Sequence, residues 1–219
     1  MKQDSSLKLN IGAGVTFIPG FINIDITEVA DIQLNLNHER LPFDDNSVDL
    51  IFSNHTLEHL EDYLHAIGEI HRVLKHGGIL LVGVPYVTLT EYNLVNPYHK
   101  QHFNEYSFDF FDPQHLLGSA AERGAVMFRK ICHRFHYMPE FANEEPEKLL
   151  WARRHLFNVV SEIVFGIMAI KDLDMPLPIQ ADTSQRLLAQ YDECMLARVP
   201  HKQSGNPTSS GRKVMSASG

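Results

Sequence analysis

The run ILLVGV, residues 79–84, is apolar at every position and constrains the fold more than any other segment. Such a run is typical of a central strand that is buried on both faces, as in the parallel sheets of α/β proteins. Ahead of it, residues 61–75 place apolar side chains at helical spacing, and the pair Gly77-Gly78 ends that helix. A helix followed directly by a buried strand predicts an α/β fold with a mostly parallel sheet.

Four shorter strands are expected before this unit, because apolar and β-branched residues alternate with Gly, Pro, Asp and Asn at their borders. They cover residues 7–11, 21–26, 31–36 and 47–54. The connections between the first three are too short for the crossover helices that normally join parallel neighbours. We therefore expect these helices to be shortened or missing, which leaves one face of the sheet in need of a cover.

The second half of the chain is expected to supply that cover. We predict a helix over residues 105–121, a strand over 126–138, a long apolar helix over 147–170 and an antiparallel strand over 192–199. The 147–170 helix has a broad apolar face, which suits packing on the open side of the sheet. The alternatives for this face are a homodimer interface or a membrane surface.

Composition indicates one domain, because 219 residues with 44% hydrophobic residues suffice for one substantial core. We assign it to residues 1–202, with a helical insertion over 139–190 and a disordered Ser/Gly-rich tail over 203–219. Since no apolar run reaches the ~18 residues of a membrane span, we expect a cytoplasmic protein. The net charge of −8 disfavours a nucleic-acid partner. Cys132 and Cys194 are too far apart in sequence to indicate a thiolate metal site.

The segment KLNIGAG, residues 8–14, is an apolar strand that runs into the turn Gly12-Ala13-Gly14. Glycines in such a turn let a ligand approach the backbone N–H groups. A dinucleotide site would need a third glycine three residues later and an acid ~20 residues further on. Phe17 stands at the third position here, and Asp25 follows the turn too soon. A nicotinamide site is therefore not predicted.

With these motifs in order, the chain resembles a class I S-adenosylmethionine-dependent methyltransferase of the small type 11 sort. The resembling segments are LNIGAG, GFINIDI, LPFDDNSVDLIFSNHTLEHL and AIGEIHRVLKHGGILLVGVP, all within residues 8–85, and RLLAQYDECMLARVPHK resembles the closing hairpin strand. The resemblance implies a Rossmann-like sheet, S-adenosylmethionine as cofactor and direct in-line transfer of a methyl group. The implied acceptor is a small molecule, with a sugar or glycan precursor as the candidate.

The resemblance also implies which residues bind the cofactor. Asp25, at the end of the second strand, would accept hydrogen bonds from the two ribose hydroxyls, which suits an ionised carboxylate. Asn37 stands where the family often has an aspartate beside the adenine, next to Leu36. The glycine turn and the end of the fourth strand would line the methionine portion. The full expected set is Asn10, Gly12, Ala13, Gly14, Asp25, Ile26, Leu36, Asn37, Asn54, His55 and Leu57.

The loop from Pro85 to Asn104 is longer than a structural connection requires, so we expect it to be functional. Its Pro-x-His-x-x-x-Phe segment resembles one near the acceptor pocket of small methyltransferases. Imidazole titrates near neutral pH, so His55 and His99 are candidates for the base that takes a proton from a hydroxyl acceptor. The expected acceptor-binding residues are Tyr86, Tyr98, His99 and His102.

Residues 53–60, SNHTLEHL, also contain the H-x-x-E-H spacing that zinc peptidases of the inverzincin type use. A zinc site would need His55 and His59 on one helical face and a third ligand, which the sequence does not display. Within the resemblance, Leu57 instead packs in the core, while Glu58 and His59 orient the next helix. We expect no metal ligands. The alternatives to a methyltransferase are a noncatalytic cofactor-binding scaffold of the same fold and a zinc hydrolase.

Overall fold

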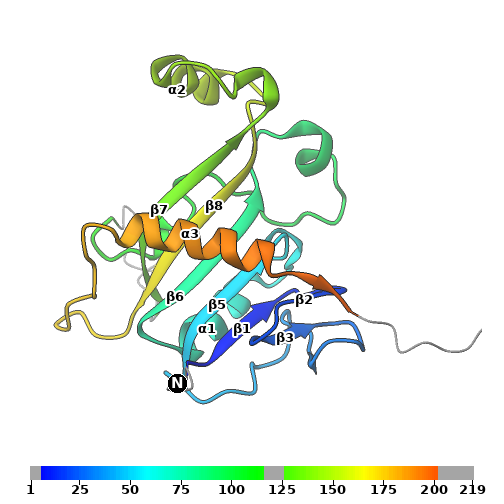
Figure 1. The fold of residues 1–219 in the computed structure, drawn as a ribbon, viewed down its shortest axis with the longest axis vertical. Coiled ribbons are helices and arrows are strands. Elements are labelled where there is room, and N and C mark those ends of the chain that lie inside the picture. Colours follow the sequence, from blue (N-terminus) through cyan, green and yellow to red (C-terminus); the bar gives the residue numbers. More distant parts are fainter. Residues whose placement is uncertain (1–5, 116–125, 202–219) are drawn as a thin grey trace, which may run out of the picture.

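The computed structural model describes residues 6–115 and 126–201 and is built around a seven-stranded sheet of order β4-β3-β1-β5-β6-β8-β7 (Figure 1). Strands β2 and β9 form a separate antiparallel pair. The strands are β1 (Lys8–Ile11), β2 (Thr16–Phe17), β3 (Ile22–Asp25), β4 (Ile32–Gln33), β5 (Val48–Asn54), β6 (Leu74–Pro85), β7 (Met127–Tyr137), β8 (Val160–Ile170) and β9 (Val199–Pro200).

The sheet is parallel from β4 to β6 and antiparallel at its other edge. Strand β8 runs antiparallel to both β6 and β7. The prediction of a mostly parallel Rossmann-like sheet with an antiparallel hairpin strand is therefore confirmed. No helix lies between β1 and β3 or between β3 and β4, so the predicted loss of these crossover helices is confirmed too.

Two helices cover the two faces of the sheet. Helix α1 (Tyr63–Val73) begins at the N-cap Asp62, whose side chain accepts from His65 N, and buries Ala66, Ile67 and Ile70 on one face. Helix α3 (Thr183–Leu196) crosses the opposite face, in front of β5, β6 and β8 (Figure 1). Its apolar side places Leu187, Tyr191 and Cys194 against Leu50, Phe52, Leu81 and Val164.

The predicted long helix over 147–170 is wrong. Helix α2 (Pro146–His155) ends early, Asn158 turns the chain with a φ of 58°, and the rest is strand β8. Because β8 is a central strand buried on both faces, it has the continuous apolar run that a buried helix also has. The segment 147–170 thus contributes a strand to the sheet, and it offers neither the expected helical cover nor a continuous helical dimer interface.

The cover of the open face comes from the segment that we predicted as a closing strand. Residues 192–199 lie mostly in helix α3, so that prediction is wrong, and the hairpin strand is β8 instead. The predicted helix over 105–121 is also wrong where the structure describes it, since only a 3₁₀ turn forms at Asp109–Phe111. Residues 116–121 and the predicted tail over 203–219 lie outside the described residues.

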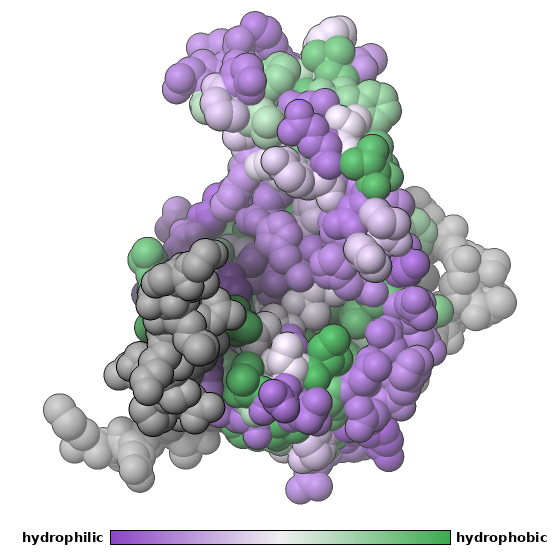
Figure 2. All heavy atoms as spheres, turned by 90° about the vertical axis from the view of Figure 1, so that its right-hand side faces the viewer, coloured by the Kyte–Doolittle hydropathy of each residue, from purple (hydrophilic) through white to green (hydrophobic). Residues whose placement is uncertain are grey.

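Among the described helices, none combines the length and the apolar character that crossing a bilayer requires. The face on the right of Figure 1 is drawn in Figure 2, where hydrophilic residues extend across the middle and apolar residues gather in separate patches.

Candidate functional site

A cavity of about 440 Å³ lies at the carboxyl ends of β1, β3 and β5. The chain passes from β1 outward to β3 and β4 and then returns to β5 on the other side of β1. Such a switch point is where open α/β sheets bind ligands, because the loops on its two sides diverge. The lining residues are Ile11, Gly12, Gly14, Ile24, Asp25, Ile26, Thr27, Leu34, Asn35, Leu36, Asn37, His55, Thr56, His59 and Leu60.

The glycine turn after β1 forms one wall of this cavity. We call it the cofactor cavity, because the sequence resemblance implies that these residues bind the cofactor. Gly12 and Gly14 have φ values of 72° and 58°, in the left-handed region that favours glycine. A Cβ atom added at Gly12 would lie 1.9 Å from Thr56 Oγ1, so the close approach of two segments requires glycine there. At Gly14 an added Cβ atom would meet no atom within 4 Å, so this position faces open space.

Asp25 holds the glycine turn and the segment after β3 together. Its Oδ2 accepts from Gly14 N at 2.8 Å, and its Oδ1 accepts from Thr27 N at 3.0 Å. An ionised carboxylate has about four acceptor positions, so two bonds leave capacity on both oxygens. Ile26 beside it is 65% exposed, which leaves an apolar side chain at the cavity edge. Asp25 is thus positioned to accept further hydrogen bonds from a ligand.

The far wall of the cofactor cavity is the loop after β4, which carries Leu36 and Asn37. The Oδ1 atom of Asn37 accepts from Glu61 N at 2.8 Å and from Asp62 N at 3.2 Å. Its carbonyl oxygen therefore fastens this loop to the start of α1. Only the two N–H donors of the amide remain for a ligand.

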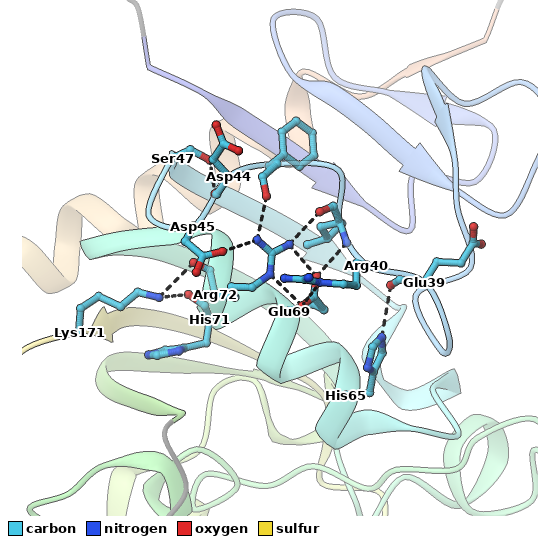
Figure 3. A network of polar contacts seen from close by, with 12 residues as sticks. Glu39, Arg40, Asp44, Asp45, Ser47, His65, Glu69, His71, Arg72 and Lys171 are labelled. Carbon is cyan, nitrogen blue, oxygen red and sulfur yellow. Dashed lines mark hydrogen bonds and ion pairs between the residues drawn. The ribbon is translucent and has the colours of Figure 1, made fainter.

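A polar network around Arg72 fixes the continuation of this loop (Figure 3). The guanidinium donates to the carbonyls of Leu41 and Phe43, both at 2.8 Å, and to Asp45 and Glu69. Glu69 in turn accepts from Leu41 N at 2.9 Å. The hydrogen bonds from Arg72 hold the pKa of Glu69 below its usual range. The network therefore ties residues 41–45 to α1.

Four residues from the expected cofactor set do not line the cavity. Asn10 is buried and donates to Asn23 Oδ1 at 2.9 Å. Ala13 and Leu57 are buried in the core. Asn54 accepts from the hydroxyl of Tyr191 on α3 at 2.6 Å. The structure thus gives these four residues packing and hydrogen-bonding roles near the cavity, while the other seven line it directly.

A second cavity, of about 480 Å³, adjoins the first and shares His55 and His59 with it. We call it the acceptor-side cavity. Most of its lining comes from the loop after β6 and from the antiparallel strands β7 and β8. The lining residues are His55, Glu58, His59, Pro85, Leu89, Tyr92, Asn96, His99, His136, Ser161 and Glu162.

His55 stands between the two cavities and is clamped by two carboxylates. Its Nε2 lies 2.7 Å from Glu162 Oε2, and its Nδ1 lies 3.3 Å from Glu58 Oε1. The hydrogen bond to Glu162, followed by the nearby carboxylate of Glu58, raises the pKa of His55 to about 9. The backbone of His55 has a φ of 52°, a strained value for a residue with a side chain, and such strain gathers at functional sites.

Of the four expected acceptor residues, the structure brings only His99 into the acceptor-side cavity. Tyr86 is buried, and its hydroxyl donates to Glu105 at 2.6 Å. The side chain of Tyr98 is 73% exposed, and His102 is exposed; neither lines the cavity. Sequence reasoning missed Glu162, although a lone acid inside the apolar run of β8 was a usable signal.

The H-x-x-E-H residues do not form the peptidase arrangement. Residues Leu57–His59 make a 3₁₀ turn, and His55 lies outside it with both ring nitrogens beside carboxylates. Leu57 is buried in the core, as the methyltransferase reading expects. His55 and His59 therefore do not share the helical face that an inverzincin needs.

Residues 13–82 match the family model described as "Methyltransferase domain". A demethylmenaquinone methyltransferase of Staphylococcus epidermidis is 36% identical over 72 residues, which are 31% of this chain and 30% of the relative. A malonyl-[acyl-carrier protein] O-methyltransferase of Coxiella burnetii is 56% identical over 41 residues, or 19% of this chain and 14% of the relative. The chain thus spans less than a third of the length of these curated relatives.

Among solved structures, an S-adenosylmethionine-dependent methyltransferase from Archaeoglobus fulgidus has the same fold. The TM-score is 0.53 at 16% identity, and the alignment covers 74% of this chain and 86% of that chain. Residues 13–82 are therefore similar to a methyltransferase domain, and the chain shares the fold of an S-adenosylmethionine-dependent methyltransferase.

Proposed function

We propose that this chain transfers a methyl group from S-adenosylmethionine to a small-molecule acceptor. The observation that carries the proposal is the junction of the two cavities at His55 and His59. The cofactor cavity combines the carboxylate of Asp25 with apolar side chains, which suits a nucleoside, and the acceptor-side cavity lies directly beside it. A donor and an acceptor held in adjoining cavities gain the proximity that methyl transfer needs.

The residues of the cofactor cavity fit S-adenosylmethionine. Asp25 would accept from the ribose hydroxyls, while Ile26 and Leu36 would pack on the apolar faces of the nucleoside. The amide N–H groups of Asn37 would donate to a ring nitrogen of the adenine. The open space at Gly14 leaves room for the methionine portion. When bound, S-adenosylmethionine supplies a methyl group on a positively charged sulfur.

The protein's own contribution is to position the acceptor and to exclude water. With its pKa raised to about 9 and both ring nitrogens beside carboxylates, His55 already holds its proton at neutral pH and cannot take one from an acceptor. His99 has its Nδ1 bound to Asn93 Oδ1 at 2.9 Å, and its Nε2 has no hydrogen bond among the described residues. Of the two expected bases, His99 is therefore the one that can contact the reacting atom of an acceptor.

The acceptor is proposed from the cavity and not from the named relatives. Residues beyond 82, where the family match ends, contribute Pro85, Leu89, Tyr92, Asn96, His99, His136, Ser161 and Glu162 to the acceptor-side cavity. Since most of that cavity lies outside the match, the quinone and acyl-carrier acceptors in the relatives' names carry little weight here. Hydrogen-bonding side chains around about 480 Å³ favour a small acceptor with hydroxyl groups, such as a sugar or glycan precursor.

An acceptor panel tests this proposal. The full chain is incubated with S-adenosylmethionine and with sugars and glycan precursors, quinols or acyl-carrier thioesters, and the release of S-adenosylhomocysteine is measured. Turnover with a hydroxyl-bearing small molecule supports the proposal. Binding of the cofactor without turnover on any acceptor would favour the noncatalytic scaffold, for which the intact cofactor cavity is the supporting observation.

A further inference from the structure

Glu58 presents a carboxylate whose position calls for a cation. Its side chain is only 1% exposed, and neither carboxylate oxygen has a hydrogen-bond partner among the described residues. The histidines nearest to it are His55, whose Nδ1 lies 3.3 Å from Oε1, and His59, whose Nε2 lies 3.9 Å from the same oxygen. His55 lies closer to Glu162, at 2.7 Å. His55 is thus shared between two carboxylates, and a buried carboxylate without hydrogen bonds is costly unless a further cation compensates it.

Two histidines beside Glu58 have their tautomers fixed by carbonyl groups. The Nδ1 atom of His59 faces the carbonyl oxygen of Tyr98 at 3.3 Å, and the Nδ1 atom of His99 faces Asn93 Oδ1 at 2.9 Å. The Nδ2 group of Asn93 donates a hydrogen bond to the carbonyl oxygen of Tyr86, so the Oδ1 atom of Asn93 is the one that faces His99. A carbonyl oxygen only accepts, so both Nδ1 atoms carry the proton. Each histidine is thus left with a lone pair on Nε2.

Histidines that bind metal ions commonly have this arrangement: one ring N–H donates to a carbonyl oxygen, and the other ring nitrogen binds the ion. One ligand atom from each of Glu58, His59 and His99 lies within 4.8 Å of the other two. All three residues line the acceptor-side cavity. The loop after β6 brings His99 to the turn after β5, which is why the H-x-x-E-H spacing alone did not reveal the group.

We propose that Glu58, His59 and His99 bind a divalent transition-metal ion of the zinc class in the acceptor-side cavity. Two imidazole nitrogens and one carboxylate oxygen are a common ligand set for such ions, and three protein ligands leave a coordination position open. Ligand atoms in a tetrahedral zinc site lie about 3.3 Å apart, so the three atoms would have to approach one another by up to about 1.5 Å to bind the ion.

The role of the ion rests on the proposed function, whereas its binding does not. An ion with an open position in the acceptor-side cavity would bind the acceptor's oxygen and lower the pKa of its hydroxyl. The lone pair of His99 would then bind the ion, and the proton of the acidified hydroxyl would pass to solvent water instead of to His99. Binding of the metal can be measured without S-adenosylmethionine and without any acceptor.

The test uses the tag-free full chain, stripped with a chelator and titrated with Zn²⁺ alone. Bound zinc is counted after gel filtration, and Co²⁺ in its place reports the coordination through its visible absorption. We expect one ion per chain. Glu58→Gln and His99→Ala should weaken binding more than the 10- to 100-fold that loss of a second-shell partner costs. His102→Ala is the matched control, because His102 is an exposed histidine on the same loop.

Circular dichroism establishes that each variant is folded. If Glu58→Gln does not fold, the zinc affinity of His99→Ala compared with that of His102→Ala tests the site. Absence of stoichiometric zinc from the folded wild type would overturn the proposal, as would equal affinity in His99→Ala and His102→Ala. Calorimetry of S-adenosylmethionine with the zinc-free protein separates the two proposals. A chain that binds zinc but not the cofactor would contradict the proposed function and leave the metal site in place.

Discussion

The hydroxyl of Tyr191 on helix α3 donates a hydrogen bond of 2.6 Å to Asn54 Oδ1 at the carboxyl end of β5. This bond joins the helix that covers the open sheet face to the strand end that precedes His55. Burial raises the pKa of Tyr191, so the hydroxyl keeps its proton and remains a donor. Helix α3 therefore supports the candidate site as well as the core.

Tyr191→Phe should lower the free energy of unfolding by about 1 kcal/mol, because it removes this bond and leaves Asn54 Oδ1 without its partner. Urea denaturation followed by circular dichroism measures the change. Tyr98→Phe is the control, since that side chain is 73% exposed and its hydroxyl makes no hydrogen bond in the described structure. Equal stability of the two variants would show that the bond contributes nothing.

Arg72→Ala should destabilise the protein by about 2 to 3 kcal/mol. The side chain of Arg72 is 17% exposed, and its loss removes the charged partner of Glu69 and the donor to two backbone carbonyls (Figure 3). Arg40→Ala provides the comparison, because Arg40 is 69% exposed and lies 3.5 Å from the same carboxylate. A surface pair of this kind is worth at most about 1 kcal/mol. The ranking fails if Arg40→Ala is the more destabilising change in thermal unfolding.

The two glycines of the turn after β1 should respond differently to alanine. Gly14→Ala should cost about 1 to 2 kcal/mol, because only the left-handed backbone opposes it. Gly12→Ala should cost more, since its Cβ atom would also collide with Thr56. Unfolding free energies of the two variants, measured side by side, give the answer. A larger loss at Gly14 would mean that the approach of Thr56 to Gly12 is not as close as described.

Lys171 should make stability rise with pH in mildly alkaline solution. Burial lowers its pKa from 10.5 to about 8, although its ammonium group donates to the carbonyls of His71 and Arg72 (Figure 3). Between these two values the unfolded chain binds the proton and the folded chain does not, so stability increases as pH rises. Since Lys171 is about half exposed, we expect a gain of about 1 to 2 kcal/mol after solvent screening.

The measurement is urea denaturation of the wild type and Lys171→Met from pH 7.5 to 9.5. The variant lacks the titrating group, so its stability relative to the wild type should fall steadily as pH rises. A constant difference across the range would contradict the lowered pKa. Other groups that titrate in this window affect both proteins and cancel in the comparison.

The sequence was informative where a local pattern determines the structure. Strands β1, β3 and β5 and helix α1 formed where turn residues and helical spacing predicted them. Strand β8 was mistaken for a helix because a strand buried on both faces has no alternation to distinguish it. Helix α3 was mistaken for a strand because residues 192–199 alternate in polarity by chance, and the N-terminal start signal near Asp182 was overlooked.

The residues of the candidate site were likewise predicted only where a local sequence pattern marks them. Gly12, Gly14 and Asp25 were found because the turn and the strand end are adjacent in sequence. Glu162 and His136 come from distant strands. The pairing of β8 with β6 brings Glu162 beside His55, and the pairing of β7 with β8 places His136 beside Glu162. The positions of Tyr86 and His102 could not be separated from that of His99 by sequence, because the path of the loop determines which side chain enters the cavity.

The central claim is that the glycine turn and Asp25 form the binding site for S-adenosylmethionine, and calorimetry of the full chain with this cofactor tests it most directly. The account predicts that the wild type and Asp44→Asn, a change at an exposed aspartate, bind equally. Asp25→Asn should bind about 10- to 100-fold more weakly, because hydrogen bonds to an ionised carboxylate contribute about 1.5 to 3 kcal/mol. Absence of binding to the folded wild type, or unchanged affinity in Asp25→Asn, would contradict the account.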